Sequence, residues 1–223
     1  MFDLAQEYDA QLREGIRLSG EDKKFFIRGR LQDLCRQLPA GFHPERILDF
    51  GCGIGDTTRK LAELFPNADL IGFDTSDPAL DHARRTYGSA RISFCGLAGF
   101  MQMAPVDLCY TNGVFHHILP EKRAGVMVQI HRVLRPGGQF ALFENNPFNP
   151  GTRMVMHCIP FDREARPLRP REAQRLLQGG GFSFLYPPRF LFYFPRSLAF
   201  FRPIESLLAR IPLGAQYYVL ARK

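Results

Sequence analysis

The stretch ILDFGCGIGDTT, residues 47–58, constrains the fold of this chain more than any other. Ile47, Leu48 and Phe50 surround one acid, Asp49, and glycines then recur at every second position. A run of helix-forming residues, RKLAELF, follows directly. A buried parallel strand that enters a glycine loop and then a helix N-terminus has this pattern. Because glycine lets a ligand approach main-chain N–H groups, the stretch predicts a ligand site after a first strand.

Strands and helices are predicted to alternate beyond this loop. The expected strands are 46–50, 69–73, 91–95, 106–110, 139–144 and a closing strand at 216–221. The expected helices are 3–18, 21–38, 57–65, 120–134, 170–178 and 198–211, with another that has Asp77 as its N-cap, Pro78 as its first residue and Tyr87 near its end. Helices of about 10–15 residues between strands imply βαβ units, and so an α/β fold with a parallel sheet covered on both faces.

Polar residues cluster where the predicted strands end. The segments Asp49–Gly55 and Asn112–His117 follow two of these strands, and Asp74 and Glu144 end two others. In open α/β sheets, ligands bind at the carboxyl ends of the strands. We therefore expect these four segments to form one site.

Two classes of cofactor use a glycine loop in this position. Dinucleotide enzymes need G-x-G-x-x-G, but the position three residues after Gly53 is an acid, Asp56. The spacing here suits a ligand without phosphate better. Asp49 is placed to hold a cationic amino group, and Asp74 to accept hydrogen bonds from ribose hydroxyls. Both roles fit S-adenosylmethionine. Two glycine hinges and two N-capping acids would be the structural alternative.

Four segments of the chain together resemble the class I S-adenosylmethionine-dependent methyltransferases, in particular their type 11/12 small-molecule group. These segments are ILDFGCGIGD, IGFDTSD, VDLCYTNGVFHHI and HRVLRPGGQFALFE. The resemblance covers residues 45–145. It implies a Rossmann-like, doubly wound, mostly parallel sheet of seven strands with an antiparallel last strand, and S-adenosylmethionine as cofactor. The cofactor-binding positions that it implies are Asp49, Gly51, Cys52, Gly53, Gly55, Asp74, Thr75, Ser76, Leu97, Ala98, Asn112, Gly113 and His117. One departure is Leu97, which stands where the family usually has an acid for the adenine amino group.

Methyl transfer from a sulfonium needs a base only if the acceptor atom must lose a proton. His116 and His117 follow the fourth strand and Glu144 ends the fifth, so all three are candidate catalytic residues. Packing and capping roles are the alternatives. Tyr8 would close over the cofactor if the N-terminal helix forms a lid, although its place in an apolar stripe suits core packing better.

The last third of the chain is basic and aromatic. Residues 151–223 carry 12 Lys and Arg against 4 Asp and Glu, whereas residues 1–150 carry 17 against 18. Residues 182–201 hold seven phenylalanines and two tyrosines. A pocket of this kind would suit a small acceptor that is apolar, acidic or both. An amphipathic basic helix at 197–211 would instead rest on a membrane surface or form a dimer face. The structural alternative is that most of these phenylalanines are core residues under a lid.

Three functions remain open from the sequence: methylation of a small, hydrophobic acceptor at O, N or C; methylation of RNA or protein guided by the basic C-terminal third; and cofactor binding without catalysis. DNA is not an expected partner, because the fourth strand ends in TNGVF rather than in a (D/N)PP(Y/F) motif and no Pro-Cys pair is present. The five cysteines lack CxxC spacing, so neither a disulfide framework nor a metal site is expected, and a cytoplasmic location fits.

We expect one methyltransferase domain over residues 1–223. Within it, residues 1–44 would form a helical lid, residues 45–145 a cofactor-binding core, and residues 146–223 an acceptor-side part. The charged start of the chain argues against a signal peptide, and prolines interrupt the longest apolar tract, so no membrane-spanning helix is expected.

Overall fold

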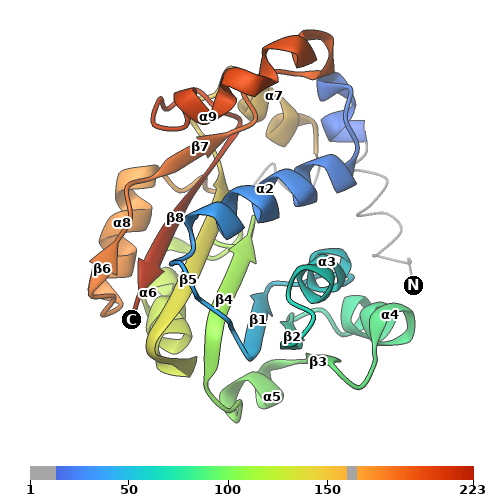
Figure 1. The fold of residues 1–223 in the computed structure, drawn as a ribbon, viewed down its shortest axis with the longest axis vertical. Coiled ribbons are helices and arrows are strands. Elements are labelled where there is room, and N and C mark those ends of the chain that lie inside the picture. Colours follow the sequence, from blue (N-terminus) through green and yellow to red (C-terminus); the bar gives the residue numbers. More distant parts are fainter. Residues whose placement is uncertain (1–13, 160–164) are drawn as a thin grey trace.

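The computed structural model describes residues 14–159 and 165–223, which fold around one mixed β-sheet (Figure 1). The strands are β1 (Arg46–Phe50), β2 (Asp69–Phe73), β3 (Ile92–Cys95), β4 (Val106–Asn112), β5 (Leu134–Asn145), β6 (Phe184–Leu185), β7 (Arg189–Leu191) and β8 (Gln216–Arg222). Their order is β3-β2-β1-β4-β5-β8-β6, and β7 also pairs with β8. Strands β1 to β5 run parallel and β8 runs antiparallel to β5. The predicted Rossmann-like sheet with an antiparallel last strand is therefore confirmed.

The sheet has eight strands rather than seven because its outer edge is interrupted. Strands β6 and β7 pair with successive stretches of β8, Leu185 opposite Ala221 and Arg189 opposite Tyr218. Pro187 and Pro188 lie between them. Proline has no N–H to donate to a strand ladder, so one continuous edge strand is split into two short ones.

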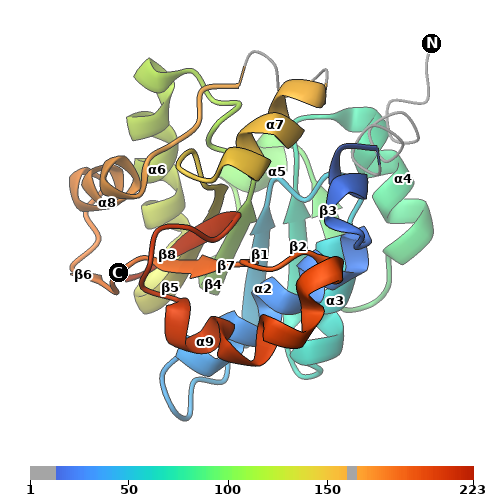
Figure 2. The same ribbon diagram turned by 90° about the horizontal axis from the view of Figure 1, so that it is seen from above.

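Helices cover both faces of the sheet, as the alternating pattern predicted (Figure 2). They are α2 (Lys23–Gln37), α3 (Asp56–Leu64), α4 (Asp77–Tyr87), α5 (Leu97–Met101), α6 (Pro120–Val133), α7 (Pro150–Cys158), α8 (Pro170–Gly179) and α9 (Glu205–Leu208), with 3-10 helices η1 (Arg17–Ser19) and η3 (Arg196–Ile204). One apolar core joins α2, α3 and α4 to the sheet, and a second joins α5, α6 and α8 to the opposite face. Both faces of the central strands are consequently buried, which explains their nearly continuous apolar sequences.

Several local predictions are wrong at the ends of elements. The N-cap of α4 is Ser76, whose side chain accepts from the Ala79 N–H, and Asp77 is the first helical residue. The predicted helix 198–211 is instead η3 followed by the single turn of α9, because Pro203 lies inside it and Leu198 has non-helical dihedral angles. Tyr8 and most of the predicted helix 3–18 lie outside the described residues.

A buried ion pair ties α2 to the far edge of the sheet. Both carboxylate oxygens of Asp33 accept hydrogen bonds from Arg189, Oδ2 from Nε at 2.9 Å and Oδ1 from a terminal nitrogen at 3.0 Å. Oδ2 also accepts from the Tyr218 hydroxyl at 2.8 Å. The network joins α2, β7 and β8, so it fixes the helix that covers the site described below.

We expect Asp33→Ala to lower the free energy of unfolding by about 3 kcal/mol, because it leaves the Arg189 guanidinium without its carboxylate. The matched control is Asp81→Ala, which removes an exposed ion pair with Arg84 on α4 and should cost less than about 1 kcal/mol. Urea unfolding followed by circular dichroism measures both. Equal midpoints for the two variants would contradict the role given to Asp33.

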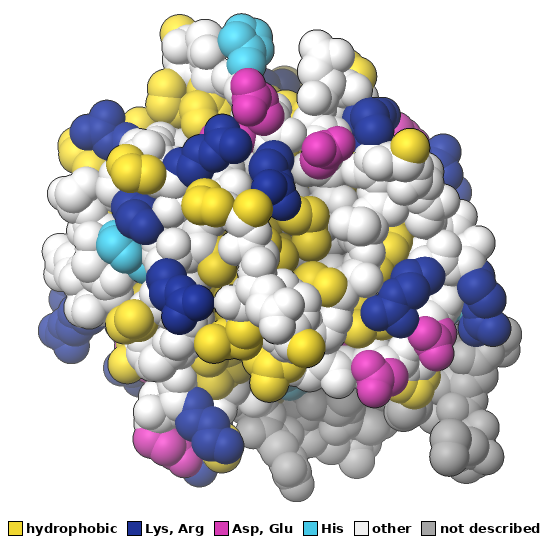
Figure 3. Space-filling model, turned by 90° about the horizontal axis from the view of Figure 1, so that it is seen from below, with side chains coloured by type: hydrophobic (Ala, Val, Ile, Leu, Met, Phe, Trp, Pro, Cys, Tyr) yellow, Lys and Arg dark blue, Asp and Glu magenta, His cyan; other side chains and the backbone are white. Residues whose placement is uncertain are grey.

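The end of the molecule at the bottom of Figure 1 is seen directly in Figure 3. Among the described residues on this face, Lys and Arg side chains stand singly between acidic, hydrophobic and neutral ones. No continuous basic track of the kind that follows a nucleic-acid backbone is visible among them.

None of the helices in the described part of the chain combines the length and the apolar character needed to cross a bilayer.

Candidate functional site

The glycine loop after β1 is shaped by backbone conformations that favour glycine. Gly51 and Gly53 have φ angles of +78° and +53°. A Cβ on Gly51 would lie 2.2 Å from Cγ2 of Val114, whereas a Cβ on Gly53 would meet no atom within 4 Å. The loop is therefore packed against the β4 side at Gly51 and open at Gly53, where a ligand can approach the backbone.

Two cavities meet at this loop. The first, which we call the α6 cavity, has a volume of about 910 Å³ and lies between the end of β2, α5 and α6. The second, the α7 cavity, has a volume of about 560 Å³ and lies between α2, α7 and the segment after β7. The residues that line both are Gly51, Gly53, Ile54, Asn112, Gly113 and His117. The ends of β1 and β4 thus form the junction between two separate spaces.

Asp74, at the end of β2, lines the α6 cavity together with Thr75 and Ser76. Its Oδ2 accepts from the Gly53 N–H at 2.8 Å and its Oδ1 accepts from the Ser76 N–H at 2.9 Å. Each carboxylate oxygen has two lone pairs, so both can accept a further hydrogen bond from a ligand hydroxyl. Asp74 therefore shapes the loop and remains able to bind a ligand.

At the junction, the side-chain oxygen of Asn112 is buried and has no hydrogen-bond partner among the described residues. Buried polar atoms are normally hydrogen-bonded, so this oxygen is able to accept from a donor that enters the junction. A ligand donor placed across the two cavities would supply that partner.

A carboxylate and a guanidinium, those of Asp49 and Arg30, both lie in the wall of the α7 cavity. Asp49 accepts a 2.6 Å hydrogen bond from the Thr58 hydroxyl. Burial raises the pKa of Asp49 to about 7, which the Thr58 hydrogen bond and the positive charge of Arg30 oppose. Arg30, on α2, donates to the Tyr110 hydroxyl at 3.1 Å and to Oε1 of Gln216 at 2.9 Å.

The partners of Arg30 distinguish it from the other cations of the cavity wall. Its two hydrogen-bond acceptors are neutral, whereas Lys23 contacts Asp56 at 2.6 Å and Arg202 contacts Glu21 at 2.9 Å. Sequence reasoning missed Arg30, because one arginine among many on an amphipathic helix carries no local signal of burial.

His116 and Glu144 form a buried pair that the sequence did not predict as a pair. Nδ1 of His116 lies 2.6 Å from Oε2 of Glu144, and Oε1 of Glu144 accepts from the Phe115 N–H at 2.8 Å. His116 lines the α7 cavity, whereas Glu144 is fully buried behind it. His117 lines both cavities, and its ring centroid is 4.1 Å from that of His116. Glu144 therefore orients the imidazole ring of His116 in the wall of the α7 cavity, next to the junction residue His117.

Other predicted positions have different surroundings. Cys52 lines the α7 cavity and Leu97 lines the α6 cavity. Gly55 is the N-cap of α3, where a Cβ would meet the rings of Phe94 and Tyr87. Ala98 lies on the exposed side of α5, outside the lining of both cavities.

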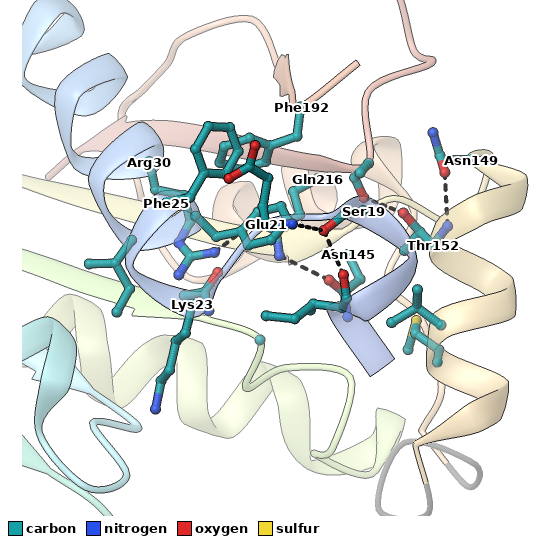
Figure 4. Close-up of a pocket in the computed structure, with 18 of the residues that line it drawn as sticks. Ser19, Glu21, Lys23, Phe25, Arg30, Asn145, Asn149, Thr152, Phe192 and Gln216 are labelled. Atoms are coloured by element: carbon teal, nitrogen blue, oxygen red, sulfur yellow. Dashed lines mark hydrogen bonds between the residues drawn. The ribbon is translucent and has the colours of Figure 1, made fainter. Parts of the chain in front are cut away.

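The rest of the α7 cavity is aromatic on one side and polar on the other (Figure 4). Phe192 has a φ of +63°, rare for a non-glycine residue, and its ring centroid lies 5.8 Å from Phe25 and 4.9 Å from Phe26. A Cβ on Gly29 would lie 2.6 Å from the Phe192 ring, so glycine makes room for that ring. The polar side chains are Ser19, Asn145, Asn149, Thr152 and Gln216. This wall suits an apolar molecule with one polar end.

Within residues 14–159 and 165–223, no three His, Cys, Asp or Glu side chains gather as a metal site would require.

Comparison with known proteins gives matches that include the glycine loop. Residues 48–140 match the family model of a methyltransferase domain. Trans-aconitate 2-methyltransferase of Azoarcus sp. is 32% identical over 120 residues, which are 54% of this chain and 47% of that protein. The enzyme of the same name from Variovorax paradoxus is 29% identical over 164 residues, 70% of this chain and 61% of that protein. The chain thus spans about half the length of the first of these relatives.

Solved structures match over nearly the whole chain at low sequence identity. A SAM-dependent methyltransferase from Archaeoglobus fulgidus aligns with a TM-score of 0.69 and 17% identity, covering 95% of this chain and 97% of that one. Human N-acetylserotonin methyltransferase, in complex with SAM, aligns with a TM-score of 0.66 and 17% identity, covering 96% of this chain and 55% of that one. These likenesses concern the fold.

Proposed function

We propose that this chain is a class I S-adenosylmethionine-dependent methyltransferase that transfers a methyl group to a small, apolar acceptor. The match of residues 48–140 to the model of a methyltransferase domain supports this proposal, and the fold agrees with it. The observation that carries the proposal is the pair of cavities meeting at Gly51, Asn112 and His117. The α6 cavity would hold the adenosine part of the cofactor, and the α7 cavity would hold its methionine part together with the acceptor. The methyl group would then cross the junction.

The residues present fit that cofactor. Asp74 would accept from the ribose hydroxyls, and Leu97 would pack on the adenine in place of the usual acid. A methionine part carries an ammonium and a carboxylate, and Asp49 and Arg30 in the wall of the α7 cavity have the opposite charges. The neutral partners of Arg30 leave its charge available to the carboxylate.

S-adenosylmethionine supplies an electrophilic methyl group when bound. The protein's part is first to position the acceptor, which provides much of the rate for a good leaving group. The aromatic wall at Phe25, Phe26 and Phe192 would hold the apolar body of the acceptor. We infer that His116 removes a proton from an acceptor hydroxyl or amine, while Glu144 orients its ring and stabilises the charged imidazole. His117, at the junction, would contact the cofactor.

The relatives support a small acceptor. The matching proteins are named for trans-aconitate, which favours a small acidic molecule over RNA or protein. The phenylalanines of the α7 cavity favour an apolar body. An acceptor that combines both, an apolar molecule with one acidic or hydroxyl end, agrees with the two observations.

Calorimetric titration with S-adenosylmethionine and with its demethylated product tests the first half of the proposal. We expect saturable binding of both. Methyl transfer is then assayed by release of the product cofactor with a panel of apolar acids, phenols and amines. Absence of binding at millimolar cofactor would overturn the proposal, and binding without turnover on any acceptor would favour a non-catalytic module.

The affinity for the cofactor should depend on pH through Asp49. Only the ionised carboxylate attracts an ammonium, and the pKa of Asp49 in the free protein is raised to about 7. Affinity should therefore be greatest above pH 7 and fall below it, by up to about tenfold per pH unit. Asp49→Asn should flatten this dependence between pH 5 and 8. A wild-type affinity that is constant across that range would contradict the contact.

A further inference from the structure

The phenylalanines of the Phe-rich stretch 182–201 lie in different environments. Phe190 is buried in the core and Phe192 lines the α7 cavity. Beyond Pro195 the apolar side chains turn outward. We define the apolar ridge as the exposed residues Leu198, Phe200, Phe201, Ile204, Leu207, Ile211 and Leu213 of η3, α9 and the following turn. Leu207 is 81% exposed and Phe200 70% exposed, which is unusual for large apolar side chains gathered in one segment.

The ridge is held in place from its inner side. The hydroxyl of Tyr193 donates to the carbonyl oxygens of Leu208 and Ile211 at 2.5 Å and 2.6 Å. Glu205 accepts from the N–H groups of Tyr193 and Phe194 at 3.1 Å and 3.0 Å. Inner contacts of this kind leave the ridge folded while its apolar side chains face solvent.

In the same segment, the acidic side chain faces inward and two of the three arginines are exposed. Glu205 is the single acid in residues 196–213, and it is engaged on the inner side. Arg202 is also turned inward, with its guanidinium 2.9 Å from Glu21 and 4.4 Å above the Phe25 ring. Arg196 and Arg210 are exposed. The outer surface of the ridge is therefore apolar and positively charged.

We propose that the apolar ridge docks on the surface of an anionic lipid bilayer. Apolar side chains flanked by arginines are what an interfacial membrane segment requires, because the former enter the acyl boundary while the latter meet lipid phosphates. The elements that carry the ridge, η3 and α9, lie at the top of the molecule in Figure 1. The segment that carries it also supplies Phe194, Pro195 and Arg202 to the wall of the α7 cavity. Docking would thus bring one wall of that cavity close to the lipid.

Flotation of the full chain with vesicles tests the proposal without any need for catalysis. We expect co-flotation with vesicles of phosphatidylglycerol and phosphatidylcholine, and at least tenfold weaker partition for Phe200→Ser/Leu207→Ser. Arg196→Gln/Arg210→Gln should weaken partition about 30-fold at low salt and less at high salt. The matched control is Leu64→Ser/Val128→Ser, which removes exposed apolar side chains from α3 and α6 and should leave partition unchanged.

Three outcomes would overturn the proposal. They are no flotation with anionic vesicles, equal flotation with vesicles of phosphatidylcholine alone, and undiminished flotation of the Phe200→Ser/Leu207→Ser protein, which we call the ridge variant. Sedimentation of the same proteins without lipid detects the competing use of the ridge as a dimer face, which would show as a concentration-dependent dimer lost in the ridge variant. Titration of the ridge variant with S-adenosylmethionine separates loss of membrane docking from failure of the proposed function, because docking can be lost while cofactor binding is kept.

Discussion

Asp74→Ala should weaken the binding of S-adenosylmethionine about 100-fold. The variant removes the carboxylate proposed to bind the ribose, and each hydrogen bond to a charged group contributes about 1.5–3 kcal/mol. It also removes the acceptor for the N–H groups of Gly53 and Ser76, which hold the loop next to the cofactor. Isothermal titration calorimetry measures the change. The cofactor's demethylated product should lose affinity in parallel, because both molecules have the same ribose.

Two further variants make this result specific. Asp74→Asn keeps one side-chain oxygen and should lose less affinity than the alanine variant. Asp77→Ala removes an exposed acid from the first turn of α4, three residues away, and should leave affinity within about twofold. If Asp74→Ala binds as tightly as Asp77→Ala, the ribose lies elsewhere and the proposed orientation of the cofactor is wrong.

His116→Ala should lower kcat by a factor of about 100 to 10,000, the range that a general base contributes. The dissociation constant of the cofactor should change less than threefold, since His116 lines the acceptor side of the junction. The rate is measured with an acceptor identified by the panel above. Added imidazole should restore part of the activity, because the α7 cavity gives it access to the vacated position.

The pH profile distinguishes a base from a packing residue. Without His116, turnover should rise about tenfold per pH unit until the acceptor itself ionises, whereas loss of packing alone would not create that slope. Glu144→Gln retains an acceptor for the Phe115 N–H and removes the carboxylate beside Nδ1. It should lower kcat with unchanged cofactor affinity. Unaltered turnover in His116→Ala would mean that no base is needed, as for an acceptor that is already a carboxylate.

Local sequence patterns were sufficient to predict the parallel part of the sheet, whereas the short edge strands β6 and β7 were not predicted. The periodicity of apolar residues, the turn residues and the acids at strand ends all depend on neighbours a few positions away. The bounds of β1, β2 and β4 were therefore predicted to within one or two residues. Patterns of the same kind were insufficient where a single residue decides a boundary. Ser76 rather than Asp77 caps α4, and Pro203 ends the helix predicted at 198–211.

Some features of the site were likewise predicted from local patterns, and others were not. Asp49, Asp74 and Asn112 were predicted because the carboxyl ends of parallel strands must share one edge. The pairing of His116 with Glu144 was not, since it joins residues 28 positions apart through the register of β4 and β5. The available charge of Arg30 depends on Tyr110 and Gln216, which are 80 and 186 positions away.

The sequence by itself determined the fold class and the strand-end acids, because these follow from periodicity and spacing along the chain. Only the tertiary structure decided what the basic, aromatic last third does with its side chains. Packing against α2 and β8 sends Phe190 into the core, Phe192 into the α7 cavity and Phe200 to the surface. The physical reason is that burial is set by contacts between distant segments, and no local pattern in the stretch 182–201 records which of its phenylalanines meet them.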